Sequence, residues 1–299
     1  MKKNFKKSKF VILPALATLV LTGVASVTGT VAWFTANRAV TVNGMKLKAQ
    51  ASSNLLVASS ETSATAKVDD SKFTSSADLT SAEVKSLIPS STTDGKNYFK
   101  ANADIAGNGK VNDSATTKYV GVDSSDVAYV DFTIQLKANN VATEDCNIYV
   151  KSLALHYGTE NTGWSNSNGK NAFRVAFFTE KYTTAFTNGV ATNSTAIIYK
   201  PSAGDNFTSG QAVGTGPALA SVSYVEKATS LTSVTKSSTE YFKTIVRVWL
   251  EGEDKHCTND LFKDSTENWS LDLGLELGDK KDETGSVTSI AVSGTTPAE

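Results

Sequence analysis

The chain has 299 residues, of which 20% are charged, and its formal net charge is −1. Without the five lysines that precede Phe10, 24 basic residues stand against 30 acidic ones, so the rest of the chain is mildly acidic. This balance argues against nucleic acid or an anionic membrane surface as the main partner. The abundance of Ser, Thr, Asn and Gly is typical of strands joined by polar turns and argues against a helical enzyme.

Residues 1–32 have the pattern of a secretory signal peptide. Five lysines stand at the start, the apolar run FVILPALATLVLTGV follows, and small residues lead up to Thr30 and Ala32. Signal peptidases accept small side chains three residues and one residue before the cut, so we expect cleavage between Ala32 and Trp33. The mature chain is then expected to be secreted, either extracellular or at the cell surface. It would meet the membrane only through the signal peptide, before cleavage.

An uncleaved membrane anchor is the alternative for this segment. The stretch from Phe10 to Phe34 is long enough to cross a bilayer, which takes about 20 apolar residues. Pro14 and the Thr, Gly and Ser content after Leu21 are unfavourable for a permanent helix, which favours cleavage.

Alternation of apolar and polar residues is the dominant pattern of the mature chain and predicts strands. Within Tyr129–Ala138, alternate residues from Val130 onward are apolar, whereas Gln135 and Lys137 belong to the polar face. In chain order, strands are predicted at Val40–Gln50, Asn54–Ser59, Tyr129–Ala138, Asn147–Tyr157, Ala172–Thr179, Ala196–Lys200, Ala218–Val225, Tyr241–Leu250, Leu271–Leu277 and Ser286–Val292. Strands with one buried and one wet face are typical of antiparallel sheets packed as a sandwich.

Two short segments have helical patterns. The run Thr80-Ser81-Ala82-Glu83 is a capping box, and the apolar residues after it predict a helix that Pro89 ends. A short turn of helix is also expected around Thr258–Phe262. Long polar insertions between the strands are interpreted as surface loops, at Ser60–Ser76, Ser90–Asp126, Gly158–Lys170 and Pro201–Gly216.

These elements predict an all-β fold, an antiparallel β-sandwich with long polar loop insertions and one or two short helices. No tandem repeat is apparent in the sequence. The even spacing of the strands favours one elaborated sandwich over residues 33–299, and two smaller domains are the alternative.

The two cysteines, Cys146 and Cys257, both lie in the mature part of the chain. In an oxidising compartment an even number of cysteines favours a disulfide, and closing so long a loop would contribute about 4–5 kcal/mol in the chain-entropy model. We therefore predict a Cys146–Cys257 bridge. The alternative is two separate thiols, one or both of them buried.

The segment Gly29–Ala49, GTVAWFTANRAVTVNGMKLKA, resembles the start of the TasA/camelysin family of secreted bacterial biofilm-matrix proteins, whose signal peptide is processed by a SipW-type peptidase. Thr30-Val31-Ala32 matches the cleavage site of that family, and Trp33–Asn37 matches its mature start. Val40–Ala49 matches its first strand. Beyond this segment the likeness is one of architecture, a β chain rich in Ser, Thr and Asn.

The resemblance implies a jelly-roll-like sandwich that assembles into extracellular fibres, in which the N-terminal segment of one subunit completes a sheet of its neighbour. Residues Trp33–Val42 suit this role, because they are largely apolar or β-branched and contain no proline. The alternative is an ordinary first strand folded into its own sandwich. The side chains expected to be buried in the neighbour are those of Trp33, Phe34, Val40 and Val42.

Some camelysin relatives are described as metallopeptidases, and a zincin site needs two histidines on one helical turn with a glutamate. Neither His156 nor His256 has these neighbours. The segment Glu251–Asp260 is rich in oxygen ligands that suit calcium, but their order fits no EF-hand loop, and we interpret it as a solvated acidic loop. Aromatic residues such as Tyr157 and Trp164 are suited to stacking on sugars, which keeps a carbohydrate-binding function open.

These patterns predict a non-enzymatic, secreted structural protein without cofactor or metal. It would be a subunit of extracellular matrix fibres that self-associates, with other matrix or surface proteins as further candidate partners. The alternative is a cell-surface adhesin that binds carbohydrate or host matrix, and a camelysin-like metallopeptidase is the third hypothesis. The sequence contains no nucleophile elbow, P-loop or dinucleotide fingerprint.

N-terminal sequencing of the secreted protein is expected to begin at Trp33, because Thr30 and Ala32 are the pair of small residues nearest the end of the apolar run. An intact Met1 would show that the segment is not removed. A start beyond Val42 would equally contradict the assignment, because the predicted assembly strand would then be lost from the mature protein.

Overall fold

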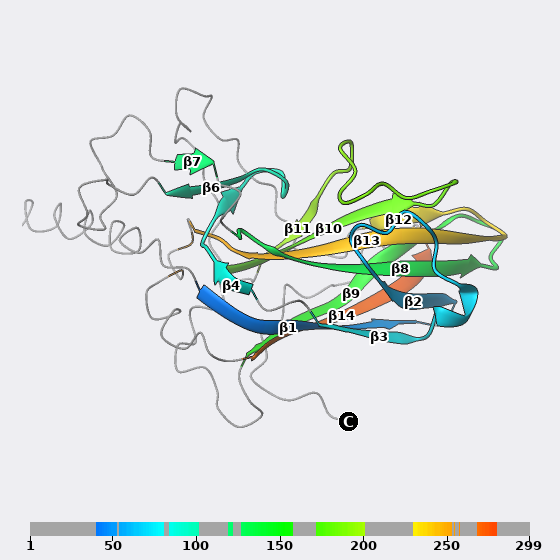
Figure 1. The fold of residues 1–299 in the computed structure, drawn as a ribbon. Coiled ribbons are helices and arrows are strands. Elements are labelled where there is room, and N and C mark those ends of the chain that lie inside the picture. Colours follow the sequence, from blue (N-terminus) through cyan, green and yellow to red (C-terminus); the bar gives the residue numbers. More distant parts are fainter. Residues whose placement is uncertain are drawn as a thin grey trace, which may run out of the picture.

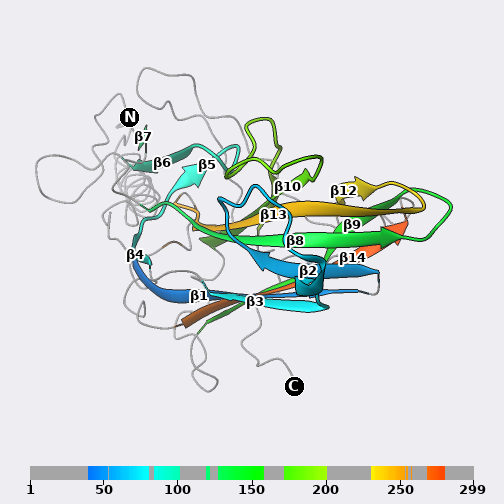
Figure 2. The ribbon, with the colours of Figure 1, turned by 45° about the vertical axis from the view of Figure 1, so that its right-hand side comes forward.

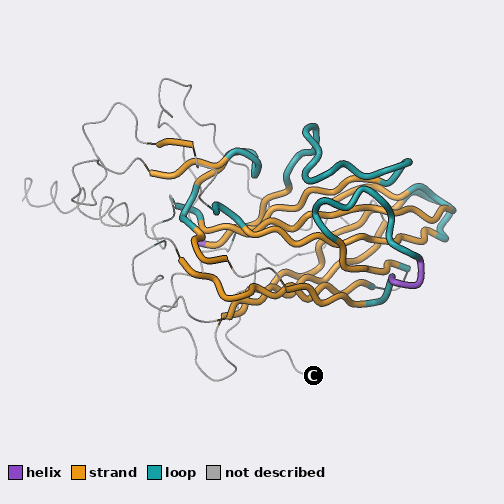
Figure 3. The backbone as a smooth tube through the Cα atoms, in the orientation of Figure 1, coloured by secondary structure: helices purple, strands orange, loops and turns teal. Residues whose placement is uncertain are grey.

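The computed structural model describes residues 40–52, 54–80, 84–101, 119–121, 127–157, 172–200, 230–252, 254, 257 and 268–279. Strands dominate this part of the chain, and a single short 3-10 helix, η1, is its only named helical element (Figure 3). The all-β fold class predicted from the sequence is confirmed. In chain order the elements are β1 (Val40–Ala51), β2 (Leu55–Ser60), η1 (Asp70–Lys72), β3 (Ser76–Thr80), β4 (Val84–Leu87), β5 (Ser91–Thr92), β6 (Tyr98–Ala101), β7 (Tyr119–Gly121), β8 (Val130–Asn140), β9 (Cys146–Tyr157), β10 (Phe173–Lys181), β11 (Ile197–Tyr199), β12 (Ser230–Val234), β13 (Ser238–Leu250) and β14 (Asn268–Asp279).

Two large sheets face each other across the core (Figures 1 and 2). The six-stranded sheet has the order β12-β9-β14-β1-β3, and β4 pairs with the start of β1. The five-stranded sheet has the order β11-β10-β13-β8-β2. A small sheet, β5-β6-β7, lies toward the end of the sandwich where β1 begins. Pairing between these strands is antiparallel as predicted, except that β1 and β14 run parallel.

Alternation along the strands decides which side chains form the core. In β14, Leu271, Leu273 and Leu275 point between the sheets and are at most 2% exposed. Alternate residues of β1, β2, β8, β9, β10 and β13 join them in one hydrophobic cluster. Burying a large aliphatic side chain contributes about 1.5–3 kcal/mol relative to leaving it in water, so this cluster holds the two sheets together. The prediction of a β-sandwich is therefore confirmed.

The outer face of the five-stranded sheet is buried as well, although the alternation predicted a wet face there. Gln135 of β8 and Lys243 and Trp249 of β13 point away from the core, yet each is at most 1% exposed. Segments 61–73, 88–99 and 182–196 lie across this face and bond to side chains that project from it. Apolar residues beneath the segments form a second cluster, made of Tyr98, Ala128, Ala176, Phe178, Ile198, Ile245 and Trp249.

The helix predicted after the capping box is wrong. Val84–Leu87 instead forms β4, which pairs antiparallel with the start of β1, and Leu87 is 1% exposed. Thr80 ends strand β3 and caps no helix. A helix shorter than about 12–15 residues is marginal in water, so pairing with β1 and burial of Leu87 outweigh the local helical signal.

The insertion Ser90–Asp126, interpreted as a surface loop, carries strands β5, β6 and β7, and strand β12 was also not predicted. The strands predicted at Ala218–Val225 and Ser286–Val292 lie outside the described residues, as does the helical turn at Thr258–Phe262. The jelly-roll strand order and the organisation of residues 33–299 as one domain stay predictions.

Candidate functional site

The predicted assembly strand is described only at its end. Val40 lies opposite Leu87 and Val42 opposite Val84, so both valines pair with β4 of their own chain. Beyond them, β1 lies between β14 and β3. These two valines therefore belong to an ordinary first strand of their own sandwich. The hypothesis that the N-terminal segment completes a sheet of a neighbouring subunit is then confined to residues 33–39. The other residues predicted for cleavage and assembly lie outside the described part, namely Thr30, Ala32, Trp33 and Phe34.

A shallow groove of about 540 Å³ lies between strands β2 and β3, and we call it the β2–β3 groove. Each strand ends its sheet, since β2 is hydrogen-bonded to β8 and β3 to β1. Val57 of β2 exchanges two backbone hydrogen bonds with Thr74, just before β3, so the groove lies beyond this bridge, along Ser59–Ser60 and Asp78–Thr80. Strand edges flanked by small side chains can accept an extended segment through main-chain hydrogen bonds, so the groove is the candidate binding site. Its lining consists of Ser59, Ser60, Glu61, Ala64, Val68, Asp78, Leu79 and Thr80.

The buried side chain of Gln135, from β8, holds the wall of the groove that residues 61–68 form. Its Oε1 accepts a hydrogen bond from the Val68 amide at 2.9 Å. Its Nε2 donates to the Ala66 carbonyl and to the Ser60 hydroxyl, both at 3.0 Å. Leaving a buried amide group unpaired costs about 1–3 kcal/mol, so the glutamine fixes this wall in one position.

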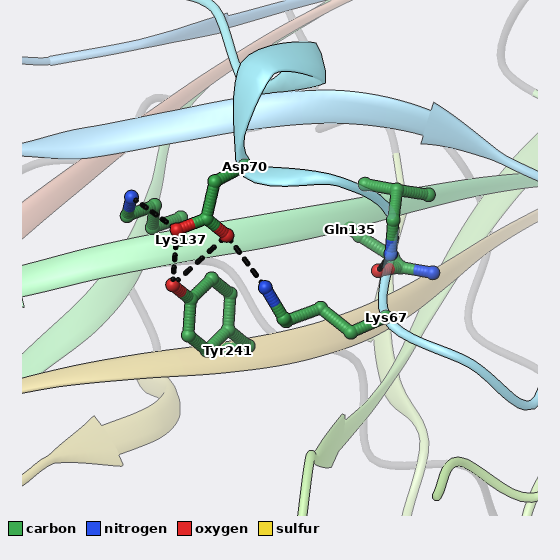
Figure 4. Close-up of polar contacts among 6 residues, drawn as sticks. Lys67, Asp70, Gln135, Lys137 and Tyr241 are labelled. Carbon is green, nitrogen blue, oxygen red and sulfur yellow. Dashed lines mark hydrogen bonds and ion pairs between the residues drawn. The ribbon is translucent and has the colours of Figure 1, made fainter.

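Asp70 of η1 holds the other end of the same loop (Figure 4). Its carboxylate accepts hydrogen bonds from Lys67 Nζ at 2.5 Å, Lys137 Nζ at 3.1 Å and the Tyr241 hydroxyl at 3.0 Å. The bond from Lys67, followed by those from Lys137 and Tyr241, lowers the pKa of Asp70 to about 2. One surface carboxylate thus ties the loop to both β8 and β13.

Lys243, on the outer face of β13, joins this loop to segment 182–196. Its Nζ donates to the Ala64 carbonyl at 3.3 Å and to the Thr187 carbonyl. Two backbone hydrogen bonds, of 2.7 and 3.0 Å, join the two segments directly. Burial lowers the pKa of Lys243. The position of the groove wall therefore depends on the sheet below it and on the neighbouring loop.

The acidic segment after β13 is not a solvated loop where the structure describes it. Glu251 and Asp254 are both 0% exposed. Arg174 of β10, equally buried, donates from Nη2 to Asp254 Oδ2 at 2.7 Å, and the Ser91 hydroxyl donates to Glu251 Oε1. These partners come from a neighbouring strand and from segment 88–99, which the local sequence does not reveal. The rest of the acidic cluster lies outside the described residues, at Glu253, His256 and Asp260.

The predicted disulfide is absent from the structure, in which Cys146 and Cys257 are both buried and no bond joins them. Cys146 begins β9 opposite Val234, near the start of β13, whereas Cys257 follows the far end of β13. That strand has 13 residues and so spans about 40 Å, whereas a disulfide requires Cα atoms within about 7 Å. Burial, followed by the carboxylates of Glu251 and Asp254, raises the pKa of the Cys257 thiol, which makes it a poor nucleophile.

The histidines contribute no metal centre that the structure describes. His156 lies in β9 opposite Ser270, and His256 lies outside the described residues. In the described ranges, no three His, Cys, Asp or Glu side chains are grouped so as to hold a metal ion.

Of the two aromatic residues considered for stacking on sugars, Tyr157 is the last residue of β9, and Trp164 lies outside the described part. Within that same part, no helix has the length and apolar character needed to span a bilayer.

Sequence reasoning missed the residues that shape the groove. The alternation placed Gln135 and Lys137 on a wet face, and no local pattern separates a buried glutamine from an exposed one. Asp70 lies in the insertion Ser60–Ser76, which was interpreted as a surface loop. The length of this insertion was the one available signal. The backbone N–H and C=O groups of so long a segment need hydrogen-bond partners, and the sheet beneath it is the nearest source of them.

Comparison with protein-family models, with curated proteins and with solved structures finds no match for the chain. The likeness of Gly29–Ala49 to the TasA/camelysin family therefore stays a prediction that those residues alone support. Any function must be inferred from the β2–β3 groove and from the segment that precedes β1.

Replacing Asp254 with alanine is expected to lower the free energy of unfolding by about 3–5 kcal/mol, because it leaves the charge of Arg174 in the interior without this partner. Urea unfolding at neutral pH measures the loss. Asp78→Ala, at an exposed edge position, should change it by less than about 0.5 kcal/mol. The double variant Arg174→Met with Asp254→Ala should recover part of the loss. Equal losses for Asp254→Ala and Asp78→Ala would contradict the assignment.

The carboxyl group of Asp70 is expected to titrate near pH 2 in carbon-detected NMR, below the ordinary value of about 3.9. Since the folded pKa is depressed, the loop is stabilised above the unfolded pKa, and this stabilisation is lost as the pH falls through the folded one. Lys67→Met should raise the titration midpoint most, Lys137→Met less, and Tyr241→Phe least. A wild-type midpoint at the ordinary value would show that the three donors do not hold the carboxylate.

Proposed function

We propose that the chain is a secreted structural protein, a subunit of extracellular matrix fibres of a Gram-positive-type bacterium. In this proposal, residues 33–39 of one copy bind in the β2–β3 groove of the next and extend its sheet. The observation that carries it is the groove itself, in which the ends of two edge strands, Ser59–Ser60 of β2 and Asp78–Thr80 of β3, lie beside one another beyond the Val57–Thr74 bridge. The likeness of Gly29–Ala49 to a family of matrix proteins points the same way.

The donor segment is long enough to cover the acceptor strand. Seven residues in the extended conformation span about 23 Å, and the five residues of β3 span about 17 Å. The donor is joined directly to β1, whose first residues are already paired with β4. A short tether to a fixed strand limits the conformational entropy that is lost on binding, which favours association.

The charges of donor and acceptor also agree. Arg38 is the single charged residue between Trp33 and Ala39, whereas the groove carries the carboxylates of Glu61 and Asp78. Both carboxylates belong to exposed residues and are accessible to an incoming guanidinium. A charge within an edge strand discourages random pairing with other chains, so the groove favours a donor that brings the opposite charge.

Apolar burial would supply the affinity. The side chains of Trp33 and Phe34 would each contribute about 1.5–3 kcal/mol if fully buried against the partner, offset in part by the cost of ordering the segment. Signal-peptide removal explains the timing, since cleavage after Ala32 would free the donor only at export. Assembly would then not begin inside the cell.

The intact secreted protein is expected to form fibres visible by electron microscopy. Deleting residues 33–39 is expected to abolish them, while the truncated chain stays a β-rich monomer by circular dichroism and sedimentation. Fibres formed by the truncated chain would overturn the proposal. Unfolding of the truncated chain would show instead that the segment belongs to its own sandwich.

Charge reversal tests the groove within the same assay. Arg38→Glu should weaken assembly at least tenfold, which corresponds to about 1.4 kcal/mol of lost association free energy. Adding Glu61→Lys and Asp78→Lys should restore it. Lys236→Glu, at an exposed turn outside the groove, carries the same charge change and should leave assembly unaltered. Failure of the restoring pair would place the acceptor elsewhere.

A further inference from the structure

The first and last strands that the structure describes lie side by side and run in the same direction (Figures 1 and 2). Strand β1 pairs in parallel with β14 from Asn43 opposite Asn268 to Ala51 opposite Leu275. Of the seven residue pairs, the six from Lys46 opposite Ser270 onward share one register, after a register shift between Asn43 and Lys46. The ladder continues into the following turn, where the Ser52 amide donates to the Leu275 carbonyl at 3.0 Å. The start of β1 and the end of β14 therefore lie at opposite ends of one parallel ladder.

This geometry decides how the fold responds to tension. A force that pulls the start of β1 and the end of β14 apart acts along both strands and slides one past the other. Every hydrogen bond of the ladder then carries load at once, because these bonds cross between the strands at a large angle to the force. An antiparallel hairpin pulled from its open end breaks its bonds one after another.

Both strands are also interior strands of their sheet. Strand β14 pairs with β9 on its other side over eleven residue pairs, and β1 pairs with β3. Sliding either strand would drag buried side chains through the core, among them Leu47 of β1 and Leu273 of β14, each 1% exposed. Resistance therefore comes from backbone pairing and from core packing together.

We infer that the parallel β1–β14 ladder is a force-bearing clamp, which lets the subunit withstand tension applied through its N-terminal segment. Its biological use rests on the proposed function, since in a fibre the donated residues 33–39 would transmit the load of the neighbour directly into β1. The resistance itself is a property of one folded chain and is present whether or not the chain polymerises.

Single-molecule force spectroscopy on the secreted protein tests the clamp, with one handle at the N-terminus and the other moved along β14. Glu276→Cys places the second handle at the far end of the ladder and loads it in shear. Ser270→Cys places it at the near end, opposite Lys46, so that the same ladder opens pair by pair. Both positions are partly exposed, and the native cysteines are buried from the coupling reagent.

The rupture force in the Glu276→Cys geometry is expected to exceed that in the Ser270→Cys geometry by about threefold or more, since unfolding under force is governed by the barrier along the pulling direction. Matching thermal unfolding midpoints of the two variants would show that the handles do not alter the fold. Equal rupture forces would overturn the clamp. A high shear force in a protein that forms no fibres would leave the clamp standing and refute only the proposed function.

Discussion

Burial of β13 on both faces is the constraint on which the rest of the structure depends. One face packs in the core between the sheets, so the residues of the other face must find partners among segments that cross it. A buried charge is costly unless it is paired and hydrogen-bonded, and the two buried outward charges of β13, Lys243 and Arg247, meet that demand with different partners. Lys243 binds carbonyls of two loops, and Arg247 binds both carboxylate oxygens of Asp131, at 2.7 and 2.8 Å, and the Gly95 carbonyl at 2.9 Å.

Segments 61–73, 88–99 and 182–196, which cover this face, are therefore positioned more by hydrogen bonds to buried polar side chains than by apolar contacts. The closest approach of these segments to the sheet shows this. At Gly95 the backbone has a φ of +68°, and a Cβ atom would lie 3.0 Å from the ring of Phe178. Only glycine allows the turn to approach the sheet closely enough for its carbonyl to reach Arg247. The next residue, Lys96, donates to three carbonyls of residues 191–194, so the turn also fastens the neighbouring segment. The loops form one connected layer, and the wall of the β2–β3 groove is its edge.

The sequence predicts the strands of the sandwich well, because alternation reports which face of a strand is apolar. It places Leu271, Leu273 and Leu275 in the core, and the structure agrees. It fails where a second layer covers a polar face, as at Gln135, since alternation cannot tell a polar residue that meets water from one that meets a folded loop. The disulfide prediction failed for a related reason, because cysteine number says nothing about which ends of the sandwich the two thiols occupy.

Strand β1 connects the groove to the clamp. Val40 and Val42 pair with the short strand β4, and from Lys46 onward β1 is held on both sides, by β14 and by β3. The same strand β3 forms one edge of the groove, so a segment bound there would be one strand away from β1 of the acceptor. Tension on the donor segment that precedes β1 would pull that strand against both of its neighbours, β14 and β3. In a chain of such subunits, the β1–β14 ladder of each sandwich would therefore bear part of the load that passes from one groove to the next.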